Sequence, residues 1–418
     1  MKTYLITGAA GFIGANFLKY KLKKCKIDNV QCKMIVLDKL TYAGNLGTIR
    51  EEIKDERVEF VKGDICNKEL VENIFMNYDI DFVVNFAAES HVDRSIEDPG
   101  IFLKTNILGT QTLMDVAKQN WTASKDRFGY PIYKEGKKFL QVSTDEVYGS
   151  LEREFPEGKF LIDNGKLIME NGLKKEELET VLNERESVPK IFGNKFFTEE
   201  TPLDPRSPYA TSKTGADMLV RAYYETYHFP VNVTRCSNNY GPYHFPEKLI
   251  PLIIKNILEG KKLPVYGDGK QVRDWLYVED HCKGIDMVID GGKLGEAYNI
   301  GGFNEETNIN IVKMTIDTIY KLIVENGKLK EKYKDIVKCR PEDINYDLIA
   351  YVQDRLGHDA RYAIDPTKTV KQLGFYPETP FIIGIEKTIK WYLDNQEWVN
   401  DVVSGDYAKY YEKMYSNR

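Results

Sequence analysis

The sequence predicts an α/β fold, a Rossmann-like doubly wound parallel sheet that carries a smaller mixed α/β lobe. Three observations lead to this prediction. Short apolar strands alternate with helical stretches up to about residue 241, which is the pattern of parallel strands joined by crossover helices. A glycine-rich loop follows the first strand directly. From Pro242 onward the chain changes to shorter, mixed elements.

Six apolar runs in the first part have the length and composition of buried strands. The expected strands are Thr3–Ile6, Met34–Leu37, Val58–Val61, Phe82–Phe86, Phe139–Val142 and Val231–Thr234. The stretches between them have helical periodicity, so we expect crossover helices there. These helices are expected at about 12–24, 68–77, 100–119 and 209–228.

The second part, residues 242–418, is expected to form the smaller lobe over the carboxyl edge of the sheet. Its expected elements are helices near 247–258, 280–290, 309–325 and 382–394, and a strand at Leu263–Tyr266. Residues 1–241 then form the first domain, and a segment at about 297–303 returns to its sheet. Residues 150–206 break the alternation. A structureless connection of that length is unusual, so a small folded excursion is expected there.

Composition excludes several classes of protein. The chain of 418 residues is 42% hydrophobic and has no apolar run long enough to span a membrane. Its net charge of −6 provides no basic field for nucleic acid. Six scattered cysteines without a C-x-x-C pair indicate free thiols, with no disulfide and no metal site. No signal-peptide pattern precedes the first strand, so the sequence favours a cytoplasmic protein.

The glycine-rich loop indicates dinucleotide binding. Gly8 allows the tight turn after the first strand, Gly11 lets the backbone approach a pyrophosphate, and Gly14 permits close packing of helix on sheet. Asp38 ends the second strand, where its carboxylate can accept hydrogen bonds from the adenosine ribose. That carboxylate would repel a 2′-phosphate, so the sequence favours NAD over NADP. Asp64-Ile65, after the third strand, is placed to frame the adenine.

A second group of residues has the chemistry of alcohol oxidation. Tyr209 and Lys213 are four apart at the start of a predicted helix, so both lie on one face. The unperturbed pKa of Tyr is about 10, and the positive charge of Lys213 is expected to lower it. Lys213 can also bond the nicotinamide ribose. A hydroxyl at Thr144, at the end of the fifth strand, completes the set.

Two adjacent carboxylates, Asp145 and Glu146, follow Thr144 directly. Plain alcohol oxidation has no use for them, whereas an acid and a base beside a redox centre suit an elimination. One carboxyl must be protonated and the other ionised, a division that like-charge proximity favours. The sequence therefore predicts a reaction in which the nicotinamide is used and then restored.

Long blocks of the sequence resemble the extended short-chain dehydrogenase/reductase family, specifically its nucleotide-sugar branch of dTDP-glucose 4,6-dehydratases. The resemblance covers nearly the whole chain. The blocks are Thr7–Gly14, Asp38–Asn45, Ala87–Ser95, Ser143–Gly149, Ser207–Tyr209, Arg235–Pro251, Val272–His281 and Gly357–Asp359. Sister epimerases share the glycines, the Tyr and the Lys, but carry small residues where this chain has Asp145 and Glu146.

The resemblance implies a catalytic role for five residues. Tyr209, supported by Lys213, takes the proton of the sugar C4 hydroxyl while NAD accepts the C4 hydride, and Thr144 hydrogen-bonds that oxygen. Glu146 removes the C5 proton, Asp145 protonates the C6 hydroxyl that leaves as water, and the hydride returns to C6. The implied product is a 4-keto-6-deoxy sugar nucleotide, a precursor of deoxysugars such as dTDP-rhamnose. The first domain is then the NAD-binding domain and the lobe binds the substrate.

The resemblance also implies two binding sets. The cofactor set is Gly8, Gly11, Phe12, Ile13, Gly14, Asp38, Lys39, Leu40, Thr41, Asp64, Ile65, Ala87, Ala88, Ser90, Thr105, Tyr209, Lys213 and Asn239. The substrate set is Ser90, Thr144, Asn238, Lys248, Leu249, Pro264, Tyr266, Arg273, Asn308, Arg355 and His358. No metal is implied. Leu356 stands where the family commonly has Pro, and the 150–206 excursion is longer than the usual connection.

Three alternatives are open at this point. The chain could be a nucleotide-sugar 4-epimerase, a 4,6-dehydratase for another nucleotide sugar, or a non-catalytic nucleotide-sensing protein on the same fold. In the family, the helices near 100–119 and 209–228 resemble the four-helix interface of a homodimer, so a homodimer is expected. If the apolar stripes of both helices face only their own sheet, the chain is instead a monomer.

Overall fold

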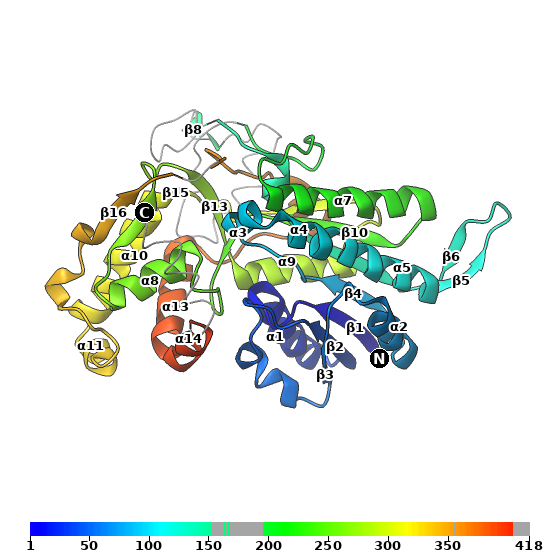
Figure 1. Ribbon diagram of the computed structural model, residues 1–418, viewed down its shortest axis with the longest axis horizontal. Coiled ribbons are helices and arrows are strands. Elements are labelled where there is room, and N and C mark those ends of the chain that lie inside the picture. Colours follow the sequence, from blue (N-terminus) through cyan, green and yellow to red (C-terminus); the bar gives the residue numbers. More distant parts are fainter. Residues whose placement is uncertain (153–161, 164–165, 168–194, 355–356, 404–418) are drawn as a thin grey trace.

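The computed structural model describes residues 1–152, 162–163, 166–167, 195–354 and 357–403 (Figure 1). Most of the 150–206 excursion lies outside these described residues, and so does Arg355. Within the described part of the chain, no helix has the length and apolar character needed to cross a membrane. All six cysteines are free.

A parallel seven-stranded sheet forms the centre of the larger part of the molecule, with strand order β14-β10-β7-β4-β1-β2-β3. The six predicted strands are all present in it. Its strands are β1 (Lys2–Thr7), β2 (Cys32–Asp38), β3 (Val58–Lys62), β4 (Phe82–Asn85), β7 (Lys138–Thr144), β10 (Val231–Cys236) and β14 (Ala297–Ile300). The order reverses direction beside β1, which is where ligands bind in doubly wound sheets.

Helices cover both faces of this sheet because successive side chains of each strand point to opposite faces. Tyr4 and Ile6 of β1 pack into a core with α1 (Phe12–Ile27) and α9 (Val278–Gly291). Leu5, between them, packs into a second core on the other face. The helices over that face are α2 (Lys68–Asn77), α5 (Thr110–Trp121) and α7 (Pro208–Tyr227).

The helix expected over 100–119 is divided into three pieces. Helix α4 (Pro99–Phe102) continues into a π-helix, η3 (Leu103–Gly109), and then into α5. In η3 the buried side chain of Asn106 bonds the backbone of Glu89 and the hydroxyl of Ser212. These three hydrogen bonds, made to two residues outside η3, hold this stretch in place. Hydrophobic periodicity alone did not predict the π-helical turn.

The smaller lobe is built around an apolar core between α8, α10, α13 and α14. Its predicted strand at Leu263–Tyr266 is present with these bounds, and the helices expected near 247–258, 309–325 and 382–394 are present with ends shifted by at most two residues. The helix expected near 280–290 is α9, which packs on the large sheet and not in the lobe. Helix α12 (Thr367–Leu373) also lies beside the large sheet, where Thr369 bonds the Asn299 carbonyl of β14. The lobe elements are β11 (Asn238–Tyr240), α8 (Leu249–Leu258), β12 (Leu263–Tyr266), β13 (Val272–Tyr277), β15 (Glu305–Thr307), α10 (Asn308–Tyr320), η5 (Lys321–Glu325), α11 (Gly327–Tyr333), η6 (Pro341–Asp343), η7 (Tyr346–Leu348), β16 (Ile349–Val352), α13 (Phe381–Asp394) and α14 (Gln396–Val402).

Several smaller elements were not expected from the sequence. They are η1 (Leu46–Ile49), η2 (Glu52–Lys54), α3 (Val92–Glu97), the hairpin β5 (Thr122–Lys125) and β6 (Pro131–Tyr133), η4 (Asp145–Tyr148), β8 (Ile162–Asp163) and β9 (Lys166–Leu167). The β5–β6 hairpin projects from the end of the molecule beyond α5 and α7 (Figure 1). The expected segment at 297–303 lies in the large sheet, where β14 pairs with β10 in parallel.

Candidate active site

The glycine-rich turn has the geometry that its sequence predicts. Gly8 lies at φ +67°, and a Cβ there would come within 2.7 Å of the Ala87 backbone nitrogen. At Gly14 a Cβ would meet the Gly8 carbonyl oxygen at 2.4 Å. Gly11 is the N-cap residue of α1, so the free N–H groups of that helix open toward the turn. These three positions leave the backbone accessible to a phosphate and pack α1 closely on the sheet.

Asp38 lies beside this turn at the end of β2 and is buried. One carboxylate oxygen accepts a hydrogen bond from the Ala10 N–H at 2.9 Å and the other from the Leu40 N–H at 2.8 Å. Burial raises the pKa of Asp38, and the two backbone bonds oppose that shift. Lys39 pairs with Asp64 at 2.8 Å. Asp64, which was expected at the adenine end of the cofactor, is therefore paired with Lys39.

The residues expected to react come from two neighbouring elements. Strand β7 ends at Thr144, and the 3-10 turn η4 then presents Asp145 and Glu146. Helix α7 begins with Pro208 and is capped by the Ser207 side chain, which accepts a hydrogen bond from Ala210 N–H at 3.0 Å. This start places Tyr209 beside Thr144, whose hydroxyl opposes the rise in the Tyr209 pKa.

Lys213 lies one helical turn beyond Tyr209 and is directed toward the same strand end. Its ammonium donates a 2.6 Å hydrogen bond to the carbonyl of Val142. Both Tyr209 and Lys213 are buried. The structure therefore brings together the five residues whose chemistry the sequence singled out.

Burial dominates the electrostatics of this group. It raises the pKa of Asp145 well above its usual range, and the charges of Glu146 and Asp274 add to the effect. It lowers the pKa of Lys213, against the charge of Asp217. The pKa of Tyr209 is raised, first by burial and then by Glu146. The expectation that Lys213 brings the Tyr209 pKa down is therefore wrong for the protein by itself, because desolvation and the carboxylates outweigh the cation.

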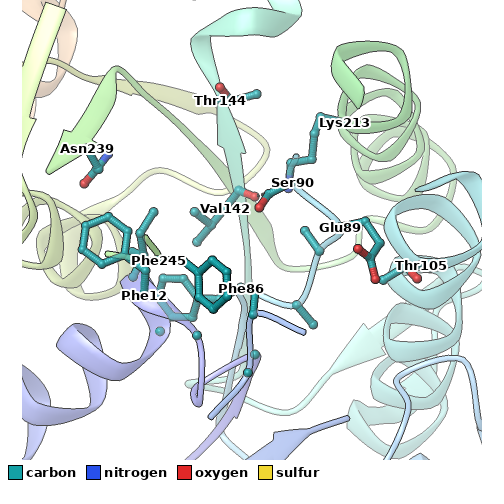
Figure 2. A pocket seen from close by; sticks show the side chains of 18 of the residues that line it. Phe12, Phe86, Glu89, Ser90, Thr105, Val142, Thr144, Lys213, Asn239 and Phe245 are labelled. Atoms are coloured by element: carbon teal, nitrogen blue, oxygen red, sulfur yellow. Dashed lines mark hydrogen bonds between the residues drawn. The ribbon is translucent and has the colours of Figure 1, made fainter. Parts of the chain in front are cut away.

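A cavity of about 360 Å³ connects the glycine-rich turn with these side chains. The rings of Phe12, Phe86 and Phe245 gather on one side of it, and Lys213 extends from the opposite side (Figure 2). Predicted residues that line it are Gly8, Gly11, Phe12, Ile13, Gly14, Asp38, Lys39, Thr41, Asp64, Ile65, Ala87, Ala88, Ser90, Thr105, Thr144, Asp145, Glu146, Tyr209, Lys213, Asn238, Asn239, Lys248 and Leu249.

The other predicted substrate residues lie in the lobe and do not line this cavity. They are Pro264, Tyr266, Arg273, Asn308 and His358. The rings of Tyr266 and His358 are in edge contact, with centroids 6.3 Å apart. Arg273 is close enough for its charge to act on Asp145. Leu40, assigned to the cofactor set, also lies outside the lining, and Arg355 lies outside the described residues.

Two buried carboxyls in the cavity wall were missed by the sequence analysis. Glu89 and Glu247 both line the cavity. Burial raises the pKa of Glu247 to about 7, although Lys248 and Arg94 oppose the shift. Both residues are within blocks that carried the family resemblance, but a glutamate next to a lysine or a serine has the sequence signature of an ordinary exposed residue. Other unpredicted lining residues are Leu37, Ala43, Gly44, Gly63, Phe86, Val142, Ser143, Cys236, Ser237, His244, Phe245 and Trp275.

A family model described as GDP-mannose 4,6 dehydratase matches residues 5–160 and 189–388. Among curated proteins, the dTDP-glucose 4,6-dehydratase of Salmonella typhimurium is 43% identical over 415 residues, which covers 99% of both chains. A dTDP-glucose 4,6-dehydratase of Escherichia coli is 45% identical over 407 residues, 97% of both chains. The similarity therefore extends over nearly the full length of each relative.

Solved structures agree with the sequence comparisons. The Bacillus anthracis dTDP-glucose 4,6-dehydratase, crystallised in complex with NAD, is 40% identical, has a TM-score of 0.72, and is covered over 100% of its length by 96% of this chain. The Streptomyces venezuelae dTDP-glucose 4,6-dehydratase has a TM-score of 0.74 at 36% identity, with 96% of this chain covering 99% of it. A Thermotoga maritima UDP-glucose 4-epimerase, 22% identical with a TM-score of 0.67 and with 94% of this chain covering 99% of it, shares the fold. With the catalytic turn, the glycine-rich loop and these full-length matches together, the chain belongs to the nucleotide-sugar 4,6-dehydratase family, among the dTDP-glucose 4,6-dehydratases.

Proposed function

We propose that this chain is a hydro-lyase that uses bound NAD to convert dTDP-glucose into dTDP-4-keto-6-deoxy-glucose. The observation that carries the proposal is the adjacent pair Asp145 and Glu146, which lines the same cavity as Thr144, Tyr209 and Lys213. A 4-epimerase needs the last three residues but has no use for a buried acid and base beside them. The names and bound cofactors of the similar proteins support the same reaction.

The glycine-rich turn, the N-terminus of α1 and Asp38 are the groups that would hold NAD. The left-handed Gly8, and the close approach at Gly14, leave the turn without side chains, so that the pyrophosphate can meet backbone N–H groups. The carboxylate of Asp38, fixed by the Ala10 and Leu40 N–H groups, is directed for ribose hydroxyls. NAD, when bound there, supplies the acceptor for the C4 hydride, the donor that returns it to C6, and a positive nicotinamide ring.

In the first step Tyr209 removes the proton of the C4 hydroxyl, and Thr144 holds the sugar oxygen by a hydrogen bond. The protein alone keeps the phenol protonated, because burial and Glu146 raise the pKa of Tyr209. The base therefore becomes effective only when positive charge is present nearby. Lys213, fixed on the Val142 carbonyl, contributes part of that charge and can donate to the nicotinamide ribose.

In the second step the C4 ketone makes the C5 proton acidic, and Glu146 removes it. Asp145 donates a proton to the C6 hydroxyl, which leaves as water, and Glu146 then returns a proton to C5 when C6 receives the hydride. This assignment follows from burial: the raised pKa of Asp145 keeps its proton, whereas Glu146 is only partly buried. Among the described residues, one Asp145 carboxyl oxygen has no hydrogen-bond partner, so it is available to donate to the sugar.

The lobe, residues 242–418, is proposed to bind the nucleotide end of the substrate and residues 1–241 to bind NAD. Arg273 is the proposed diphosphate ligand, since a guanidinium suits bidentate phosphate recognition. Tyr266 and His358, whose rings are in contact, are proposed to bind the base, and Lys248 and Asn308 complete the proposed set. Discrimination of dTDP-glucose from other nucleotide sugars is assigned to this lobe.

The proposed assembly is a homodimer, and the proposed location is the cytoplasm. Exposed apolar side chains gather on α4, η3 and α7, namely Ile101, Leu103, Leu108 and Met218, with exposed fractions from 39% to 53%. These are the elements of the expected four-helix interface, and a second copy would cover them. The free thiols support a reducing compartment.

The test is a substrate panel assayed with the purified full-length protein and added NAD. With dTDP-glucose we expect a 4-keto-6-deoxy product, detected by its absorbance in alkali, without net formation of NADH. UDP-glucose and GDP-mannose serve as matched alternatives. Formation of dTDP-galactose would establish the epimerase instead. Binding of NAD without turnover of any sugar nucleotide would establish a nucleotide-sensing protein.

A further inference from the structure

Helix α7 carries a third buried polar residue on the face that holds Tyr209 and Lys213. Asp217 follows Lys213 by four residues, so the three side chains lie one above another at intervals of one helical turn. Tyr209 is 8% exposed, Lys213 5% and Asp217 3%. A carboxylate one turn from a buried ammonium is its natural counter-charge, yet no step of the proposed reaction uses it.

Asp217 does not reach the cavity and is held from the other side by Arg235 of β10. One carboxylate oxygen accepts a 2.9 Å hydrogen bond from Arg235 Nε. Arg235 Nη1 donates to the Tyr148 hydroxyl at 2.9 Å, and that hydroxyl donates to Asn299 Oδ1 at 2.8 Å. The chain of bonds fixes the carboxylate from η4, β10 and β14, three elements at the carboxyl edge of the sheet.

The second oxygen of Asp217 accepts no hydrogen bond from the residues that the structure describes. A buried carboxylate with a free lone-pair direction keeps a strong local field. Of the neighbouring charges, Asp217 is the first that opposes the loss of the Lys213 proton by burial. The arrangement leaves one oxygen of the carboxylate to act on the ammonium, while Arg235 holds the other oxygen.

Resting on the proposed function, we propose that Asp217 is a positioning residue of the reaction, which keeps Lys213 protonated and directed at the nicotinamide ribose. The charged and titratable groups around Lys213 and Asp217 come from α7, β10 and η4, with Glu89 in the wall of the same cavity as Lys213. They are Tyr209, Arg235, Cys236, Asp145, Glu146 and Tyr148. Asp217 has a larger effect on the Lys213 pKa than Cys236 has, and because it is an anion it raises that pKa.

A purely structural ion pair would have a different signature. Removing one partner of a buried pair destabilises the fold, but it leaves the pH dependence of the chemistry unchanged. If Asp217 acts through Lys213, the loss of the Lys213 proton should set the alkaline limit of activity and of NAD binding. The limit should move when Asp217 loses its charge, because the ammonium then loses its counter-charge in a site of low dielectric.

The experiment compares Asp217→Asn, Asp217→Glu and Asp115→Asn with the wild type as full-length protein. Asp115 is the matched control, because its carboxylate holds the same helix through the Tyr223 hydroxyl at 2.8 Å but lies near the far end of α7. The first readout is the pH profile of kcat with dTDP-glucose. The second is the rise in unfolding midpoint caused by saturating NAD, measured over the same pH range.

In Asp217→Asn we expect the alkaline limb of both profiles to move toward neutral pH by about one pH unit. Asp217→Glu keeps the negative charge, so both of its limbs should lie close to their wild-type positions. Asp115→Asn should leave both limbs at their wild-type positions. Unchanged limbs in a folded Asp217→Asn protein, with only the melting temperature lowered, would overturn the proposal. If Asp217→Asn does not fold, the double variant Asp217→Asn, Arg235→Gln removes both charges of the pair. Because Asp217 is the member that acts on Lys213 and Arg235 lies on its other side, the limbs should still move toward neutral pH, but by less than in the single variant.

The two readouts separate this proposal from the proposed function. If the wild type does not turn over dTDP-glucose, the function is wrong, and the NAD-dependent midpoint still tests Asp217. If turnover is normal and the midpoint profile of Asp217→Asn matches the wild type, the positioning role is wrong and the function stands.

Discussion

Replacing Asp145 by Asn should stabilise the protein, by an amount that grows with pH. Asp145 is 2% exposed, and its pKa is raised by burial first, then by the charges of Glu146 and Asp274. In the unfolded chain the same carboxyl titrates near 3.9. The folded state therefore holds a proton that the unfolded state releases, and rising pH favours unfolding until the folded pKa is passed.

The size of the effect follows from linkage. Between the two pKa values, each pH unit costs the wild type about 1.4 kcal/mol relative to a variant that cannot titrate. The advantage of Asp145→Asn should grow by this amount for each unit above pH 4.5 until the folded pKa of Asp145 is passed. For a chain of 418 residues, with an unfolding entropy of about 2 cal/mol/K per residue, this corresponds to roughly 1.6 °C in the unfolding midpoint per pH unit.

The assay is a thermal unfolding series of both proteins in matched buffers over this pH range. Asp335→Asn, at an exposed position, is the control and should show a constant difference from the wild type. The activity of Asp145→Asn should fall at the loss of water, while C5 exchange with solvent remains measurable. A difference in midpoint that is constant from pH 4.5 to 6.5 would mean that Asp145 is ionised in the fold. It could then not be the proton donor.

Three further results are expected. Glu146→Gln should still oxidise C4 but not remove the C5 proton, so absorbance at 340 nm should accumulate on mixing with dTDP-glucose; loss of the oxidation itself would assign Glu146 to binding. Gly8→Ala should lose NAD binding and about 2 kcal/mol or more of stability, because its Cβ would meet the Ala87 backbone. Gly129→Ala, where φ is also positive but no atom lies within 4 Å of the Cβ, should lose about 1 kcal/mol. Equal losses in the two variants would refute the steric argument. Sedimentation of the wild type should show twice the chain mass. Leu108→Glu or Met218→Glu should give monomers, whereas Ile132→Glu, at an exposed position on the hairpin, should remain dimeric. A wild-type monomer with full activity would refute the dimer.

The large sheet could be predicted because its strands obey a rule that sequence displays. Tyr4 and Ile6 face one core and Leu5 the other, so β1 is apolar at consecutive positions, as parallel strands buried on both faces are. Strand β13 was missed for the opposite reason. It is fully buried, yet it contains Arg273 and Asp274. The Asp274 carboxylate accepts hydrogen bonds from the Gly302 and Asn304 N–H groups, partners that no local pattern indicates.

The candidate site divides in the same way. Gly8 and Gly14 could be predicted because a Cβ at either position would meet backbone atoms, and Asp38 could be predicted because it ends the strand that follows the glycine-rich loop and its helix. The pair Asp217–Arg235 could not, because its members come from a helix and a strand that meet only in the folded protein. The predicted direction of the shift in the Tyr209 pKa was wrong for a related reason. Spacing shows which charges are near, but it does not show how much water is excluded.

The site thus opposes the stability of its own fold. At neutral pH, burial makes the ionised forms of Asp145 and Lys213 less favourable in the fold than in the unfolded chain, whereas Tyr209 is protonated in both. A difference of one in pKa between the folded and unfolded chain corresponds to about 1.4 kcal/mol, and the apolar cores on both faces of the sheet must offset that cost. The same burial gives the reaction its order. Without the added positive charge of a bound nicotinamide Tyr209 stays protonated, and Asp145 holds its proton until the C6 hydroxyl leaves. A site of this kind is expected to oxidise the sugar only when cofactor and substrate are both in place.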